Sequence, residues 1–158
     1  METSDFFNSI REGNLERTAA LLKAHPKLIS SRDQRGSTPL ILAGYYNQAE
    51  VVRLLLDQGA AVDEKDGSGN TALMGACFKG YTGIAEILIE AGANVNERNG
   101  MGGTCLIFAV TFNREPMARL LLEKGARVDA KDPEGKTAVD HARSQGLHNL
   151  IPILEAQS

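Results

Sequence analysis

The residues of this chain that could perform chemistry are two cysteines and a glycine-rich segment that contains one of them. The segment reads NGMGGTCLIFA at positions 99–109 and includes Cys105, while Cys77 lies earlier in the chain. A thiol beside a histidine base can act as a nucleophile, and a glycine-rich loop before a helix can hold a phosphate group. A cysteine-dependent enzyme and a nucleotide-binding protein are therefore the first two alternatives.

Neither chemistry has its residues at the required spacing. The GMGG sequence lacks the G-x-G-x-x-G pattern and the Lys-Ser/Thr pair of phosphate-binding loops. Segment 64–75 resembles a calcium-binding loop, but its last position is Gly75, where a bidentate glutamate is needed. The histidines, His25, His141 and His148, follow no metal-ligand spacing. The sequence therefore predicts no metal, no cofactor and no catalytic centre, with both thiols buried as structural residues.

The composition excludes several classes of partner. The 158 residues are 42% apolar and 23% charged, as in a soluble globular protein, and their net charge is -3. This balance argues against nucleic acid or an anionic membrane as the main partner, because both bind basic surfaces. The opening METSDFFNSI does not resemble a signal peptide, and no stretch is long enough to span a bilayer. With two cysteines we expect a cytoplasmic protein; export with a signal peptide absent from this sequence is the alternative.

A repeat with a constant step runs through the chain and accounts for most of its glycines. Each unit contains the pattern G-x-T-x-x-x-x-A, followed by a leucine and a Gly-Ala pair. The segment at 99–109 is thus one copy of a unit that also reads DQRGSTPLILA, DGSGNTALMGA and DPEGKTAVDHA. The repeated positions are Gly36, Gly69, Gly102 and Gly135; Thr38, Thr71, Thr104 and Thr137; Ala43, Ala76, Ala109 and Ala142; Leu55, Leu88 and Leu121; and Gly59, Gly92 and Gly125.

Each unit is predicted to form a tight turn and two short helices. Asp or Asn before the glycine favours an Asx turn, and the threonine is a good N-cap for the helix that follows. Pro39 fits the first helical position, where its missing N–H costs nothing. Asn47, or a glycine or asparagine in the equivalent position, ends this helix, and a second, apolar helix stops at the Gly-Ala pair. Such short helices are marginal alone, so neighbouring units must bury one another's apolar faces.

This unit strongly resembles the ankyrin repeat, which has the same length and contains the core G-x-T-P-L-H-x-A. GSTPLILA is the closest copy, and the resemblance covers nearly the whole chain. It implies an all-α repeat solenoid, a stack of helix–turn–helix units with β-hairpin loops and about five repeats, including degenerate N- and C-terminal caps. We expect a single ankyrin repeat domain over 1–158, divided into an N-cap repeat 1–31, repeats 32–64, 65–97 and 98–130, and a C-cap repeat 131–158.

The chain departs from the family pattern in two columns. Proline survives only at Pro39, and the histidine is replaced throughout, so the family's Thr–His hydrogen bonds between repeats are not expected. The replacements are Ile41, Met74, Ile107 and Asp140. Pro152 predicts a shortened final helix. The capped ends favour a monomer.

The resemblance implies that a partner protein binds on the concave face, through the hairpin tips and the ends of the first helices. A basic row precedes the turn of each unit and consists of Arg32, Lys65, Arg98 and Lys131. These bases could attract an acidic partner, or neighbouring carboxylates could neutralise them; the sequence leaves both interpretations open.

An aromatic row stands just before the residue that ends each first helix, where the family is free to vary. Tyrosine and phenylalanine are favoured anchors in protein interfaces. The row consists of Tyr45 and Tyr46, Phe78 and Lys79, Thr111 and Phe112, and then Ser144 and Gln145. The alternative is that one residue of each pair packs in the core under the hairpin. Arg35 and Met101 complete the predicted protein-binding residues.

These features predict a non-catalytic protein–protein interaction module that acts as an adaptor or inhibitor by occupying a partner protein. Binding of a small ligand or anion at the basic row is the alternative. A cysteine-dependent enzyme ranks last, because Cys77 and Cys105 have no histidine column near them.

Overall fold

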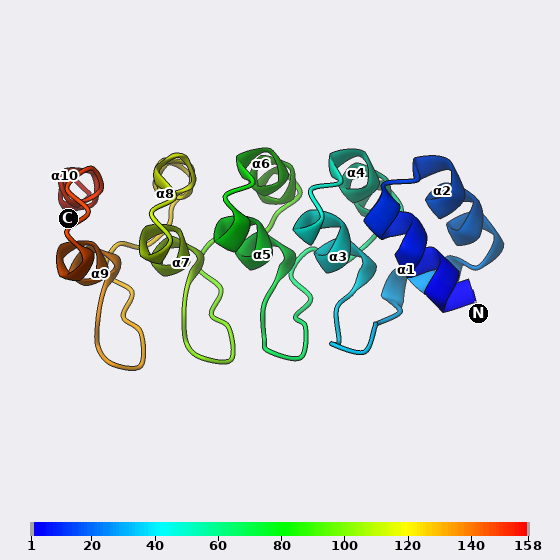
Figure 1. The fold of residues 1–158 in the computed structure, drawn as a ribbon, viewed down its shortest axis with the longest axis horizontal. Coiled ribbons are helices and arrows are strands. Elements are labelled where there is room, and N and C mark those ends of the chain that lie inside the picture. Colours follow the sequence, from blue (N-terminus) through cyan, green and yellow to red (C-terminus); the bar gives the residue numbers. More distant parts are fainter. Residues whose placement is uncertain (1, 158) are drawn as a thin grey trace.

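The computed structural model describes residues 2–157, which form a stack of helical pairs (Figure 1). An inner layer of helices adjoins the loops, and an outer layer covers its other side. The inner helices are α1 (Glu2–Glu12), α3 (Pro39–Tyr45), α5 (Ala72–Lys79), α7 (Cys105–Thr111) and α9 (Ala138–Gln145). The outer helices are α2 (Leu15–Ala24), α4 (Ala49–Asp57), α6 (Thr82–Glu90), α8 (Glu115–Glu123) and α10 (Ile151–Glu155), with the 3-10 helix η1 (Pro26–Ser30) after α2. This arrangement confirms the predicted all-α repeat solenoid.

The inner helices begin and end at the residues that the repeat predicts. The hydroxyl of Thr38 accepts a hydrogen bond from the backbone N–H of Ile41 at 3.2 Å, and the threonines of the next three units do the same. Such an N-cap contributes about 1 kcal/mol. The residues after the helices adopt left-handed backbone conformations, with φ of 57° at Asn47 and 52° at Asn113. Glycine or asparagine is needed there because other side chains disfavour this conformation.

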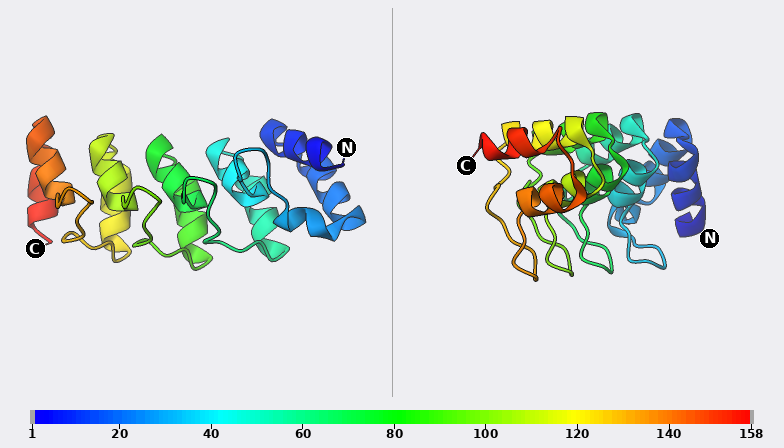
Figure 2. Two further views of the ribbon diagram at one scale, coloured as in Figure 1. Left: turned by 90° about the horizontal axis from the view of Figure 1, so that it is seen from below. Right: turned by 60° about the vertical axis from the view of Figure 1, so that its left-hand side comes forward.

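Four loops of hairpin shape project from the inner layer on one side of the stack (Figure 2). In the first loop, the Oδ1 atom of Asp33 accepts hydrogen bonds from the N–H groups of Arg35 and Ser37, both at 2.9 Å. The equivalent turn residues of the next three loops bind their own loops in the same way. Over residues 2–157 the loops contain one isolated antiparallel bridge, between Arg98 and Thr104, and no named strand. They are therefore hairpin turns with little β-ladder.

The core runs continuously through the stack, between the two layers. Leu55, Leu88 and Leu121 of the outer helices are fully buried, and so are the alanines that recur in the inner helices. Burying a leucine side chain stabilises a fold by about 1.5–3 kcal/mol. The small alanines let neighbouring inner helices approach one another, so each unit completes the core of the next.

The two ends of the stack replace standard units. At the N-terminus, α1 packs on α3 and buries Phe6 and Ile10, and at the C-terminus α10 has only five residues and contains Pro152. The shortened final helix is as predicted. The proposed repeat boundaries remain a prediction, and their outermost residues, 1 and 158, lie outside the described residues. No helix within residues 2–157 has the length and apolar character needed to cross a membrane.

Candidate protein-binding surface

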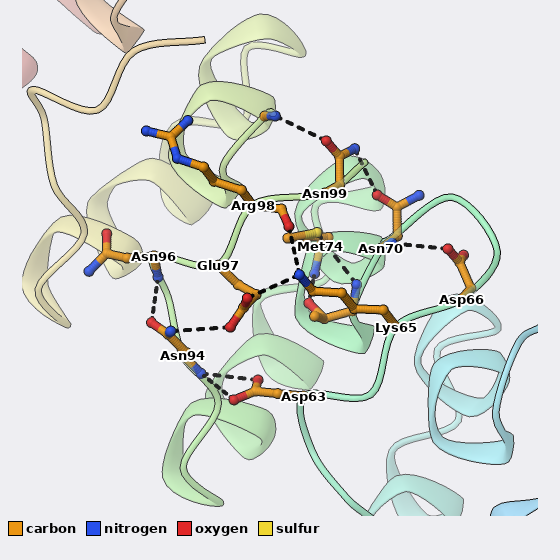
Figure 3. Close-up of polar contacts among 12 residues, drawn as sticks. Asp63, Lys65, Asp66, Asn70, Met74, Asn94, Asn96, Glu97, Arg98 and Asn99 are labelled. Carbon is orange, nitrogen blue, oxygen red and sulfur yellow. Dashed lines mark hydrogen bonds and ion pairs between the residues drawn. The ribbon is translucent and has the colours of Figure 1, made fainter. Parts of the chain in front are cut away.

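Three of the four side chains of the basic row donate hydrogen bonds across the junctions between repeats. Figure 3 shows the contacts of Lys65 with Glu97 and with the carbonyl of Arg98. Arg32 donates through Nη1 to the carbonyl oxygens of Gly36 at 2.7 Å and Lys65 at 2.6 Å. Arg98 binds the corresponding carbonyls one repeat later, at 2.8 and 2.7 Å. The Nζ atom of Lys65 donates to the carbonyl of Arg98 at 3.0 Å. Each of these three bases therefore ties its own loop to the following one.

Carboxylates complete two of these junctions. Arg32 forms an ion pair with Glu64 at 2.8 Å, and Lys65 forms one with Glu97 at 3.1 Å. Lys131 differs, because its exposed side chain has no ion pair or hydrogen bond among the residues that the structure describes. Of the two interpretations that the sequence leaves open for this row, internal neutralisation describes the contacts of Arg32 and Lys65.

The loop tips are joined by backbone contacts. The N–H of Gly67 donates to the carbonyl of Arg35 at 3.2 Å, and that of Gly100 donates to the carbonyl of Ser68 at 2.9 Å. At the next tip the equivalent residue is Pro133, which has no N–H to donate. Neighbouring loops are thus held together at both tip and base over the first three loops.

The aromatic row is exposed at the C-terminal ends of the inner helices. Tyr45 and Tyr46 are each 44% exposed and Phe112 is 50% exposed, whereas Phe78 is half-buried. Met101, at the tip of the third loop, is 81% exposed. These residues include all but one of the large, exposed apolar side chains within residues 2–157; the other is Leu15 on α2.

The rings of the aromatic row contact one another in pairs, one within a repeat and one between repeats. The centroids of Tyr45 and Tyr46 are 5.7 Å apart, and those of Phe78 and Phe112 are 5.8 Å apart, both in edge-to-face geometry. The Nζ atom of Lys79 lies 4.5 Å from the centroid of the Tyr45 ring, a cation–π contact between α5 and α3. The row therefore forms an apolar strip of two ring clusters, and Lys79 of α5 contacts the first of them.

The structure adds Phe108 to the aromatic row and shows that another member of the row, Thr111, is half-buried. Phe108 of α7 was not predicted, yet its ring centroid lies 4.4 Å from that of Phe78, and its edge reaches the space beside Gly103. The signal in the sequence was Gly103 itself, where the other units have serine, asparagine or lysine. Thr111 is half-buried, and its hydroxyl donates to the carbonyl of Ile107 at 2.7 Å.

A groove of about 1240 Å³ lies between the first two loops and the inner helices α1, α3 and α5. Its apolar lining includes Leu42, Tyr45, Tyr46 and Phe78, and Gly75 also lines it. We use the term inner face for this groove together with the exposed residues of α7 and the third loop.

The charges on the inner face are mostly positive. Helices α3, α5 and α7 contain no carboxylate, and their only charged residue is Lys79. Arg35, at the first loop tip, is exposed and has no side-chain partner among residues 2–157. Asp33 and Asp66 also line the groove, but each directs Oδ1 to two backbone N–H groups of its own turn. Arg35 and Lys79 are thus exposed cations of this face without an ion pair among the described residues, and Asp33 and Asp66 are carboxylates held within their own turns.

The groups considered for catalysis are in structural positions. Cys77 and Cys105 are free and fully buried, and a hydrogen bond with Cys105, together with burial, raises the pKa of Cys77 well above its ordinary value. This thiol is therefore held in its unreactive, protonated form. His141 lies 2.9 Å from Asp132 through Nε2 and Oδ2. No cluster of three or more potential metal ligands occurs in the described part of the chain.

Two family comparisons match the chain. A model described as ankyrin repeats in three copies matches residues 6–99, and a model described as ankyrin repeats in many copies matches residues 88–142.

Proposed function

We propose, from the premise that this chain belongs to the ankyrin repeat family, that it binds a partner protein on its inner face and acts by occupancy. Ankyrin repeats are generally non-catalytic modules for protein–protein interaction. An adaptor would hold its partner in a complex, and an inhibitor would cover the partner's working surface. In both cases the effect comes from binding alone, in a cytoplasmic monomer.

The observation that carries this proposal is the distribution of exposed apolar side chains. Tyr45, Tyr46, Phe112 and Met101 cluster on one side of the stack, while the outer helices keep their large apolar residues largely buried. Aromatic residues that are solvent-exposed in the free protein gain the most from burial in a complex, and such residues dominate interface energetics. The exposed strip is therefore the surface that a partner would cover.

The test is capture of partner proteins from lysate by the wild type and by the double variant Tyr46→Ala/Phe112→Ala. Both rings are exposed, so their removal should leave the thermal unfolding midpoint nearly unchanged. Loss of two interface anchors should weaken binding by about 100-fold or more, which abolishes capture. Leu15→Ala is the matched control, because it removes an exposed apolar side chain from α2, away from the inner face.

Equal capture by the wild type and a folded double variant would contradict binding on the inner face. Loss of capture by the Leu15→Ala variant as well would point instead to general adhesion through exposed apolar groups.

A second candidate function is anion binding beside the basic row. A polar pocket of about 590 Å³ lies at the bases of the third and fourth loops, and its charged lining consists of Arg98, Arg127, Lys131 and one carboxylate, Asp129. The side chains of Arg127 and Lys131 have no partner among residues 2–157 and are free to bind an anion. A thermal-shift titration with phosphate and nucleotides tests this, and an unchanged unfolding midpoint in the wild type would count against it.

A further inference from the structure

One glycine of the inner face has no structural reason to be a glycine. Gly75 lies in the middle of α5, and its φ is not in the left-handed region that favours glycine. A Cβ atom added to Gly75 would meet no heavy atom within 4 Å. Glycine weakens a helix interior relative to alanine, so this residue costs stability without satisfying a packing constraint.

The neighbouring units carry bulky side chains in the same column. Leu42 occupies this position of the repeat in the preceding unit and Phe108 occupies it in the following unit, on the adjacent inner helices. The repeat backbone therefore accepts a large side chain at this position, and α5 leaves the space open. With Leu42 and Phe78 beside it in the groove, this space is an apolar recess, which we call the Gly75 socket.

Two cations without ion pairs lie near the Gly75 socket. Lys79 is one helical turn beyond Gly75 on α5, next to the ring of Tyr45, and Arg35 lines the same groove from the first loop tip. Helices α3, α5 and α7 carry no carboxylate, and the two carboxylates that line the groove, Asp33 and Asp66, accept hydrogen bonds from the backbone of their own turns. The surroundings of the socket therefore match an apolar group with negative charges beside it.

We propose that the partner inserts one large apolar side chain into the Gly75 socket while acidic residues beside it face Arg35 and Lys79. The occupant is an extended acidic segment of a partner protein. The segment is recognised through its side chains rather than by strand addition, because the N–H groups of Gly67 and Gly100 are already bonded to neighbouring loop tips. This inference rests on the proposed function and adds the chemistry that the partner must present.

The experiment uses a displayed library of short random peptides, selected on the immobilised full-length protein. We expect enrichment of peptides with a large apolar residue beside aspartate or glutamate. The strongest enriched peptide is then labelled and titrated against variants. Gly75→Leu, which fills the socket with the residue found at position 42, should weaken binding at least tenfold. The charge reversal Arg35→Glu/Lys79→Glu should weaken it about tenfold and reduce its salt dependence.

Matched controls separate these effects from general damage. Gly83 lies on the outer helix α6, and a Cβ there would also meet nothing within 4 Å, so Gly83→Leu adds the same side chain away from the groove. Lys27→Glu/Lys124→Glu reverses two exposed charges that do not line the groove. Both controls should bind the peptide like the wild type. The neutral pair Arg35→Gln/Lys79→Gln replaces the charge reversal if that variant does not fold, with the same direction of change expected.

Enrichment of basic or uncharged peptides, or of nothing, would overturn the inference, and so would a Gly75→Leu protein that binds the selected peptide like the wild type. Capture of partner proteins from lysate tests the proposed function independently of the peptide experiment. If capture is lost with Tyr46→Ala/Phe112→Ala but retained with Gly75→Leu, binding on the inner face is supported and the role of the Gly75 socket is contradicted. If capture survives all of these variants, both proposals are contradicted.

Discussion

Two glycines close together in the second full unit show how differently the loops and the inner face of this protein are built. At the second loop tip, a Cβ added to Gly69 would lie 2.5 Å from the backbone nitrogen of Gly100 in the next loop. On α5, a Cβ added to Gly75 would meet nothing within 4 Å. The loops are closed against one another by backbone contacts and by the basic row, whereas the inner face keeps apolar rings and open space on its surface.

This difference separates the surface that holds the stack together from the surface that is available to a partner. Arg32, Lys65 and Arg98 donate hydrogen bonds to carbonyl oxygens of the following unit, so substitutions there should act mainly on stability. Tyr45, Tyr46 and Phe112 of the aromatic row keep about half of their surface exposed to solvent, so substitutions there should act mainly on binding. Substitutions in the loops and on the inner face test this division.

The largest effect is expected for Gly69→Ala. Its φ is 81°, which disfavours a side chain, and the new methyl group would force the second and third loops apart. We expect a loss of about 2–4 kcal/mol in the free energy of unfolding, measured by urea denaturation. Gly59→Ala is the control, because its φ is 94° but its surroundings are open, so it should lose only about 1 kcal/mol. Equal losses for both would show that contact between the loops contributes nothing.

The next effect concerns the basic row. Arg98→Met removes two hydrogen bonds to carbonyl oxygens, those of Gly102 and Lys131, and should lower the free energy of unfolding by about 1 kcal/mol. Lys131→Met removes the fourth base of the row, which has no side-chain partner among the described residues. This substitution should change the free energy of unfolding by less than about 0.5 kcal/mol. The same denaturation experiment measures both. Identical values would contradict the division of the row into three bonded bases and one free base.

A change of opposite sign is expected at Gly75. Replacing this helical glycine by alanine should raise the free energy of unfolding by about 0.5–1 kcal/mol, because alanine is the better helix former and meets no neighbour. Thermal unfolding should show a higher midpoint than in the wild type. A lower midpoint would mean that the space over Gly75 is needed by the fold, and the comparison with Gly69 would no longer hold.

The smallest effect is a dependence on pH in the last loop. Hydrogen bonds from the backbone of Lys136, and then from His141 and Glu134, hold the pKa of Asp132 below its ordinary value. A lowered pKa in the folded state stabilises the fold above the unfolded pKa of about 3.9, and this contribution is lost as the pH falls through the folded value. Asp132→Asn should therefore flatten the fall of the thermal midpoint below about pH 4.

Asparagine can replace Asp132 in its turn, because Asn99 makes the same two backbone contacts in the third loop, both at 3.0 Å. Asp57→Asn, on the exposed part of α4, removes a carboxylate without touching a turn and serves as the control. A midpoint that falls as steeply in Asp132→Asn as in the wild type would assign the acid sensitivity to other carboxylates.

The replacement of the family histidine has a local solution that the sequence did not reveal. In the unit with Met74, the sulfur accepts a hydrogen bond from the N–H of Thr71 at 3.4 Å. In the last unit, the carboxylate of Asp140 accepts one from the N–H of Thr137 at 2.9 Å. These bonds stay within one turn of helix, so the caps do not depend on a partner in the next repeat.

The sequence by itself determined the repeat, the turns, the helix caps and the burial of both cysteines. The turns and caps depend on residue types within one unit, such as Asp33 before its turn, Thr38 at its cap and Asn47 at the left-handed end of the helix. Local backbone chemistry acts over a few residues, and a single unit of the repeat displays all of it.

Only the tertiary structure decided what the basic row binds, that Phe108 joins the rings of the aromatic row, and that the space over Gly75 stays open. Each of these depends on atoms that lie about one repeat away in the sequence and come together only when the units stack. Arg98 reaches the carbonyl of Lys131 in the next unit, and Phe108 meets Phe78 of the preceding unit. Those long-range contacts decide whether a side chain bonds within the protein or stays exposed for a partner. The residue type alone does not decide this, because the same type occurs in both roles.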